Sequence, residues 1–103
     1  MSKNAKLDIK QLRAIGHKLN PVVTVAGKGL NDNVLTEIER ALSDHELIKI
    51  KLAVGSREAR SEVAAEICQL TNSSLVQSIG NVVLLLRHSK QPDPKLSNLL
   101  RPQ

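Results

Sequence analysis

Hydrophobic residues recur along this chain with two different spacings, and the spacings change from one segment to the next. Steps of three and four residues are typical of an amphipathic helix, and short apolar or alternating runs are typical of strands. The helical spacing occurs over 7–19, 34–42 and 63–71, and the strand-like runs occur over 22–25, 47–54, 75–79 and 82–86. The pattern therefore predicts the order α-β-α-β-α-β-β.

Polar and special residues mark the ends of these segments. Asp8, Asn31 and Ser56 each stand just before a helical stripe, where a side-chain oxygen can accept a hydrogen bond from the first turn. Pro21 ends the first helix, because the residue before a proline disfavours helical geometry. Gly80-Asn81 separates the last two apolar runs and predicts a tight β-hairpin.

The order of elements predicts a single compact α/β domain with a four-stranded mixed sheet packed with helices. Helices connect the first three strands, which favours parallel pairing among them, and the hairpin adds an antiparallel pair. The near-continuous apolarity of 22–25 predicts a buried strand. In the run 47–54, Ile48 and Ile50 alternate with Lys49 and Lys51, so this strand should have one buried and one basic, less covered face.

Composition changes the picture in one respect, because the chain contains no Phe, Trp or Tyr. Its core must be aliphatic, and it cannot stack nucleic-acid bases on aromatic rings.

The net charge is +5, and it is unevenly spread: residues 1–28 carry +5 and residues 29–48 carry −4. This segregation favours one basic and one acidic face, with a polyanion as partner, although a solvated mixed surface remains an alternative.

The expected location is the cytoplasm. A single cysteine excludes an internal disulfide, and no apolar stretch is long enough for a signal peptide or a membrane span.

We expect the domain to occupy residues 1–88. Residues 89–103 contain three prolines and are predicted to form an extended tail. Leu96, Leu99 and Leu100 either dock this tail as a short patch or leave it unordered.

The search for catalytic chemistry is negative. The three histidines are far apart, and none stands near a cysteine or carboxylate at metal-ligand spacing. Cys68 lies close to an apolar stripe and is predicted to be a packed thiol. Glu37 and Glu39 are two residues apart on a helix, so their side chains diverge and cannot form a carboxylate pair. We expect no enzymatic activity, no cofactor and no metal.

The segment Ala26-Gly27-Lys28-Gly29 joins the first strand to the second helix and carries a lysine between two glycines. It matches neither the Walker phosphate loop nor the dinucleotide fingerprint. Two interpretations remain open: an ordinary tight turn, or a clamp in which glycines, a helix N-terminus and Lys28 approach nucleic-acid phosphates.

Several motifs together resemble the CRM domain family, named for chloroplast RNA splicing and ribosome maturation, in its bacterial stand-alone YhbY-like form. The resemblance covers about residues 7–88. The motifs that carry it are Leu12-Arg-Ala-Ile-Gly-His17, Asn20-Pro-Val-Val23, Gly29-Leu30, Glu37-Ile-Glu-Arg-Ala-Leu42, His45-Glu-Leu-Ile-Lys-Ile-Lys51 and Val76-Gln-Ser-Ile-Gly80.

The resemblance implies an RNA-binding domain similar in fold to the C-terminal domain of translation initiation factor three. It also implies association with ribosomal RNA of the large-subunit precursor. The family's GxxG loop, which is similar to the backbone clamp of KH domains, aligns with 26–29, so Ala26 stands where the family has its first glycine. An aromatic residue of the family's last strand is replaced here by Leu86.

We therefore expect a monomeric RNA-binding protein that contacts rRNA and a ribosomal subunit precursor, with neither DNA nor membrane as partner. The predicted RNA-binding residues are Gly27, Lys28, Gly29, Lys10, Arg13, His17 and Lys18, followed by Lys49, Lys51, Arg57 and Arg87. Phosphate contacts should supply most of the affinity. The competing hypothesis is a protein-interaction module that docks on a ribosomal protein through the acidic second helix or the tail.

Overall fold

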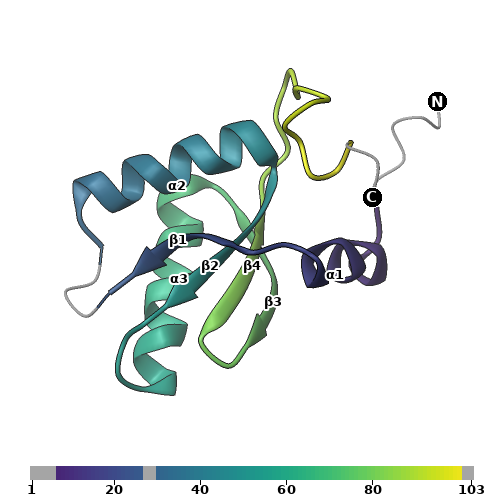
Figure 1. Ribbon diagram of the computed structural model, residues 1–103. Coiled ribbons are helices and arrows are strands. Elements are labelled where there is room, and N and C mark those ends of the chain that lie inside the picture. Colours follow the sequence, from purple (N-terminus) through teal and green to yellow (C-terminus); the bar gives the residue numbers. More distant parts are fainter. Residues whose placement is uncertain (1–6, 27–29, 101–103) are drawn as a thin grey trace.

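The computed structural model describes residues 7–26 and 30–100 and has the predicted order of elements (Figure 1). The helices and strands are α1 (Ile9–His17), β1 (Pro21–Val25), α2 (Asp32–His45), β2 (Leu47–Leu52), α3 (Arg57–Thr71), β3 (Ser74–Ile79) and β4 (Val82–Leu86). The predicted Gly27, Lys28 and Gly29 lie outside the described residues.

All three helices begin where the polar residues predicted them to begin. The side chains of Asp8 and Asn31 accept hydrogen bonds from backbone N–H groups three residues later, at 2.8 and 2.9 Å. Ser56 does the same for α3 at 3.1 Å. Each bond satisfies a backbone donor that the first helical turn leaves without a partner. At the other end of α3, Asn72 adopts a left-handed conformation, with φ of 54°, and stops the helix.

The sheet has the order β1-β2-β4-β3, with β1 parallel to β2 and the other neighbours antiparallel. The mixed sheet and the Gly80-Asn81 hairpin are confirmed, and Gly80 takes the positive φ of 57° that the turn requires. Two predictions are wrong. β3 does not pair with β2, because β4 lies between them, and β1 is an edge strand in which Val22 is 49% exposed.

The two faces of the sheet carry separate hydrophobic clusters. α2 and α3 cover one face, where Ile48 and Ile50 pack with residues such as Ile38 and Ile67. α1 covers part of the opposite face, where Leu12 packs against the other strand positions. The predicted alternation of β2 is confirmed, since Lys51 is exposed on the α1 side. At the end of the helical spacing predicted over 63–71, Thr71 is buried, as a stripe position should be, whereas Leu70 is exposed.

The tail docks as far as it is described, because residues 89–100 return to the junction between α2 and β2 (Figure 1). Glu46 at this junction is 3% exposed and accepts hydrogen bonds from the Ser89 N–H and the Ser97 hydroxyl, both at 2.6 Å. Asn98 donates from its backbone to His45 and from its side chain to Leu47, at 2.9 and 2.7 Å. Buried polar contacts thus hold a segment that has little regular structure.

Candidate nucleic-acid interface

One edge of the sheet gathers several chain segments that a polyanion could contact. Because β1 and β2 are parallel, their carboxyl ends and the N-termini of α2 and α3 lie at the same edge. The Ala53 N–H donates to the Val25 carbonyl at 2.8 Å, and the Leu52 N–H donates to the Asn81 carbonyl at 2.6 Å. These bonds join the ends of β1 and β2 and the hairpin turn. We call this edge the loop edge. It comprises Ala26, Leu30, the carboxyl ends of β1 and β2, the N-termini of α2 and α3, and Asn81.

The loop edge combines cationic side chains with two helix N-termini. Lys51 and Arg57 are both exposed there, and helix N-termini carry partial positive charge and free N–H groups. Asp32 and Glu58, in the first turns of α2 and α3, lower the local charge. Lys51 stands one residue before the end of β2 and Arg57 begins α3, so both lie near the Gly80-Asn81 turn.

The basic side chains of α1 form a second group. Lys10, Arg13, His17 and Lys18 are all exposed and belong to the helix or its C-cap. They do not lie at the loop edge, because α1 precedes β1 and the connection to α2 follows it (Figure 1). Five strand residues span about 16 Å at the usual rise. Only an extended ligand could contact both groups at once.

Between these groups, the α1 side of the sheet contains a hollow of about 380 Å³. Half-buried Lys49 contributes its charge, and Gln77 contributes an amide. The other lining residues are mainly apolar, among them Leu19 at the end of α1 and Ile79 on β3. Lys49 thus lies between α1 and the loop edge, two positions before Lys51 on β2.

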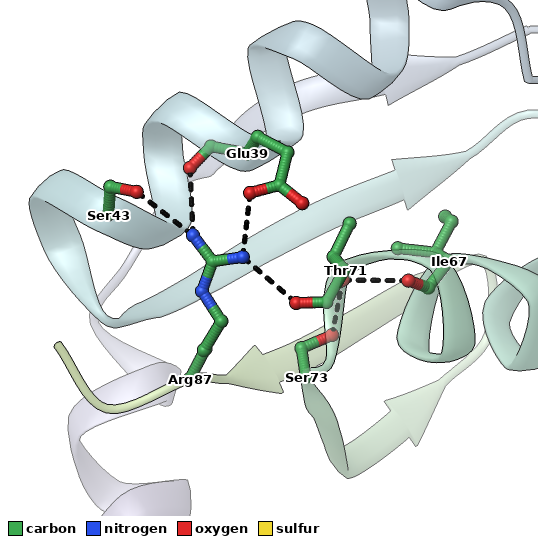
Figure 2. A network of polar contacts seen from close by, with 6 residues as sticks. All are labelled: Glu39, Ser43, Ile67, Thr71, Ser73 and Arg87. Carbon is green, nitrogen blue, oxygen red and sulfur yellow. Dashed lines mark hydrogen bonds and ion pairs between the residues drawn. The ribbon is translucent and has the colours of Figure 1, made fainter.

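The structure gives Arg87 a different environment from the other predicted site residues. Its guanidinium donates to the Glu39 carboxylate at 2.7 Å, the Thr71 carbonyl at 2.9 Å, the Ser43 hydroxyl at 2.9 Å and the Glu39 carbonyl at 3.2 Å (Figure 2). The side chain is 21% exposed. Arg87 connects the end of β4 to α2 and α3, so its guanidinium is engaged within the fold rather than free for a ligand.

The remaining reactive side chains are dispersed. Within residues 7–26 and 30–100, no three His, Cys, Asp or Glu side chains are grouped so that they could hold a metal ion. Burial raises the pKa of the Cys68 thiol, although a hydrogen bond with Ser73 partly opposes this effect. His45 Nδ1 lies 2.8 Å from the Leu96 carbonyl and contributes to docking the tail. Among the described helices, none has the length and apolarity to cross a membrane.

Fold and surface together define a small α/β domain with an edge that combines helix N-termini, parallel strand ends and the exposed cations Lys51 and Arg57. Comparison with known proteins names the family. The model of the CRS1 / YhbY (CRM) domain matches residues 6–87, and the chain belongs to this family. The predicted resemblance is confirmed.

Several relatives have similar lengths. A Pseudomonas aeruginosa protein named as a probable RNA-binding protein is 50% identical over 92 residues, which cover 89% of this chain and 88% of the relative. A Haemophilus influenzae protein named as an RNA-binding protein is 44% identical over 80 residues, with 78% and 81% covered. A solved Staphylococcus aureus structure matches with a TM-score of 0.72 and 31% identity, over 84% of this chain and 93% of that one. The predicted fold class is therefore confirmed.

Proposed function

We propose that this protein binds RNA, without a catalytic activity of its own, through the loop edge and the basic side chains of α1. The observation that carries the proposal is that the N-termini of α2 and α3, together with Lys51 and Arg57, lie at the end of the fold where β1 and β2 finish. The names of the relatives support RNA as the polyanion. The finer proposal, which follows from the predicted resemblance, is that the RNA is ribosomal RNA of the large-subunit precursor during ribosome assembly.

The chemistry of the surface suggests how RNA is held. The chain has no aromatic side chain on which bases could stack, so binding depends on phosphate, sugar and backbone contacts. Helix N–H groups and cations at the loop edge would hold one stretch of backbone. Lys10, Arg13, His17 and Lys18 would hold another stretch about one strand length away. A structured RNA presents phosphates at such separations, so the shape of the RNA would select the site.

Salt dependence of binding tests the surface. The double variants Lys51→Gln/Arg57→Gln and Lys10→Gln/Arg13→Gln each remove two charges. Each should lower the slope of log K against log salt by about 1.5, because every phosphate contact contributes about 0.7–0.9. The matched control is Arg40→Gln/Lys95→Gln, which removes two exposed charges elsewhere and should leave the slope unchanged. Equal slopes in all four proteins would exclude this surface.

The ribosomal assignment needs a separate experiment. Ultraviolet crosslinking in cells, followed by sequencing of the crosslinked RNA, should enrich a discrete site in large-subunit rRNA and its precursor. Loss of that enrichment in the Lys51→Gln/Arg57→Gln variant would connect the site to the loop edge. Crosslinks spread evenly over messenger and transfer RNAs would contradict the ribosomal assignment and leave the general RNA-binding proposal standing.

One observation favours the alternative of a protein-interaction module. A groove of about 640 Å³ runs between α2 and β1, and its charged lining residues include Glu37 and Asp44 as well as Arg40. The two carboxylates would repel the phosphates of RNA and would attract a basic segment of a protein. Affinity capture with and without ribonuclease separates the two functions: partners that persist after ribonuclease, and are lost in Glu37→Gln/Asp44→Asn, would support protein docking.

A further inference from the structure

A second open groove, of about 600 Å³, lies between α3 and the edge strand β3. Its α3 wall consists of residues spaced three, four and seven positions apart, which places them on one helical face. These residues are Arg57, Arg60, Ser61 and Ala64, and Cys68 continues the same face. Leu75 and Ser78 line it from β3. The groove is hollow because most of these side chains are small.

The charge of this groove differs from that of the groove beside α2. Two guanidiniums line it, and the described lining residues include no carboxylate. Neither Arg57 nor Arg60 has an ion-pair partner among the residues that the structure describes. Unpaired guanidiniums are suited to phosphate, which they bind with two parallel hydrogen bonds. The groove beside α2 combines one arginine with two carboxylates, and phosphate would be repelled there.

Part of the groove lining is apolar. Leu75 is 48% exposed, so its side chain offers an accessible aliphatic surface there. Ala64, Ala65 and the Cys68 thiol face the same space. The volume lies within the range of about 300–1,000 Å³ that is usual for small-molecule sites. An unstacked base would fit against these apolar side chains, and the guanidinium planes offer the stacking surface that the chain otherwise lacks.

The groove is continuous with the loop edge, since Arg57 begins α3 and Gly80 begins the hairpin turn. We propose that the groove receives one nucleotide of a single-stranded segment of the bound RNA, with its phosphate on Arg57 and Arg60 and its base over Leu75. The inference rests on the proposed RNA-binding function and deepens it. It assigns single-stranded RNA to this groove and structured RNA to α1 and the rest of the loop edge, with Arg57 at the boundary between the two.

The single cysteine provides a direct probe of occupancy. Iodoacetamide alkylation of Cys68 at about pH 8.5, where a fraction of the thiol is ionised, measures access to the groove in the natural chain. The extent of alkylation is read by mass spectrometry. A random-sequence single-stranded RNA of about twelve nucleotides should slow alkylation at least about fivefold at saturation. An RNA duplex of the same length, bound to saturation, should slow alkylation by less than about twofold, because its bases are not free to enter.

Two substitutions test the groove by affinity, each with a matched control. Arg60→Gln removes a charge inside the groove, and Arg40→Gln removes one on α2. Ala65→Leu fills the groove, and Gln69→Leu adds an equally apolar residue on α3 outside the lining. In fluorescence anisotropy, Arg60→Gln and Ala65→Leu should each weaken single-stranded RNA binding about fivefold. Both controls should stay within about twofold of the original protein, in keeping with exposed positions.

The outcomes separate this inference from the function on which it rests. If the protein binds neither RNA, the proposed function fails. If it binds RNA but Cys68 stays unprotected and the groove variants match their controls, only the groove assignment fails. Protection by millimolar AMP as strong as by RNA would overturn the assignment to an RNA strand. Protection by an oligoglutamate peptide and not by RNA would assign the groove to an acidic protein segment.

Discussion

Arg87 gives the sharpest test between a structural role and an RNA-binding role. The sequence predicts it as an RNA-binding residue, whereas in the structure its guanidinium contacts α2 and the end of α3. The substitution Arg87→Gln removes its charge and all four guanidinium hydrogen bonds, which reach α2 and the end of α3 (Figure 2). A structural role requires that stability fall and that RNA binding stay unchanged. A phosphate-binding role requires that RNA binding weaken and that stability stay unchanged.

The structure sets the expected magnitude. The bonds to the Thr71 carbonyl, the Glu39 carbonyl and the Ser43 hydroxyl should each contribute about 0.5–1.5 kcal/mol. The ion pair with the Glu39 carboxylate adds less than about 1 kcal/mol, because that side chain is 47% exposed and solvent screens the pair. These contributions are not additive, and water replaces some of the lost partners. Arg87→Gln should therefore lower the free energy of unfolding by about 2–3 kcal/mol.

Urea unfolding followed by far-ultraviolet circular dichroism is the suitable assay, since a chain without Trp, Tyr or Phe has no useful intrinsic fluorescence. The denaturation midpoint should fall with an unchanged slope. Arg87→Lys keeps the charge but cannot reproduce the forked geometry, so it should lose about 1–2 kcal/mol. Arg40→Lys on the surface of α2 is the control. Stability losses below about 0.5 kcal/mol with a reduced salt slope of RNA binding would refute the structural assignment.

Three further predictions concern packing, the tail and the thiol. Gly16→Ala would place a Cβ against the buried side chain of Leu84, so calorimetry should show a loss of about 1–2 kcal/mol in the free energy of unfolding from overpacking. An unchanged melting temperature would contradict close packing of α1. Glu46→Gln weakens the acceptor of the Ser97 hydroxyl, so hydrogen exchange in residues 89–100 should accelerate while the sheet stays protected; uniform exchange would exclude a local tail contact. Because burial raises the pKa of Cys68, the folded thiol keeps its proton longer than the unfolded thiol, and stability should decline as pH rises through the ordinary cysteine pKa. Cys68→Ala should show a smaller decline in urea unfolding, and identical pH profiles would contradict this effect.

The elements and their limits followed from the sequence because local interactions set them. The capping oxygens of Asp8, Asn31 and Ser56 act within three residues, and the Gly80-Asn81 turn depends on one positive φ. Helical and strand periodicities likewise report which residues share a face. The family motifs extended this local information to fold class, as the match over residues 6–87 confirms.

Other properties depended on contacts between residues far apart in the chain. The same strand pattern is compatible with β3 or β4 beside β2, and packing of both faces selects β4. No local signal distinguishes Arg87 from an exposed arginine, because its partners lie 16 to 48 residues away. From the sequence, the carboxylate of Glu46 would be expected at the surface. In the structure it is buried, with hydrogen bonds from Ser89 and Ser97 of the tail. The groove beside α3 exists because small side chains on a helix meet an edge strand in space.

The sequence alone thus determined the elements, the family and the list of basic residues that RNA could contact. Only the tertiary structure decided how these residues are grouped. It placed Lys51 and Arg57 at the loop edge, held the α1 cations one strand length away and enclosed Arg87 between helices. The physical reason is that charge and periodicity are local properties of a chain. The distance between two charges is set by the packing of the segments that carry them.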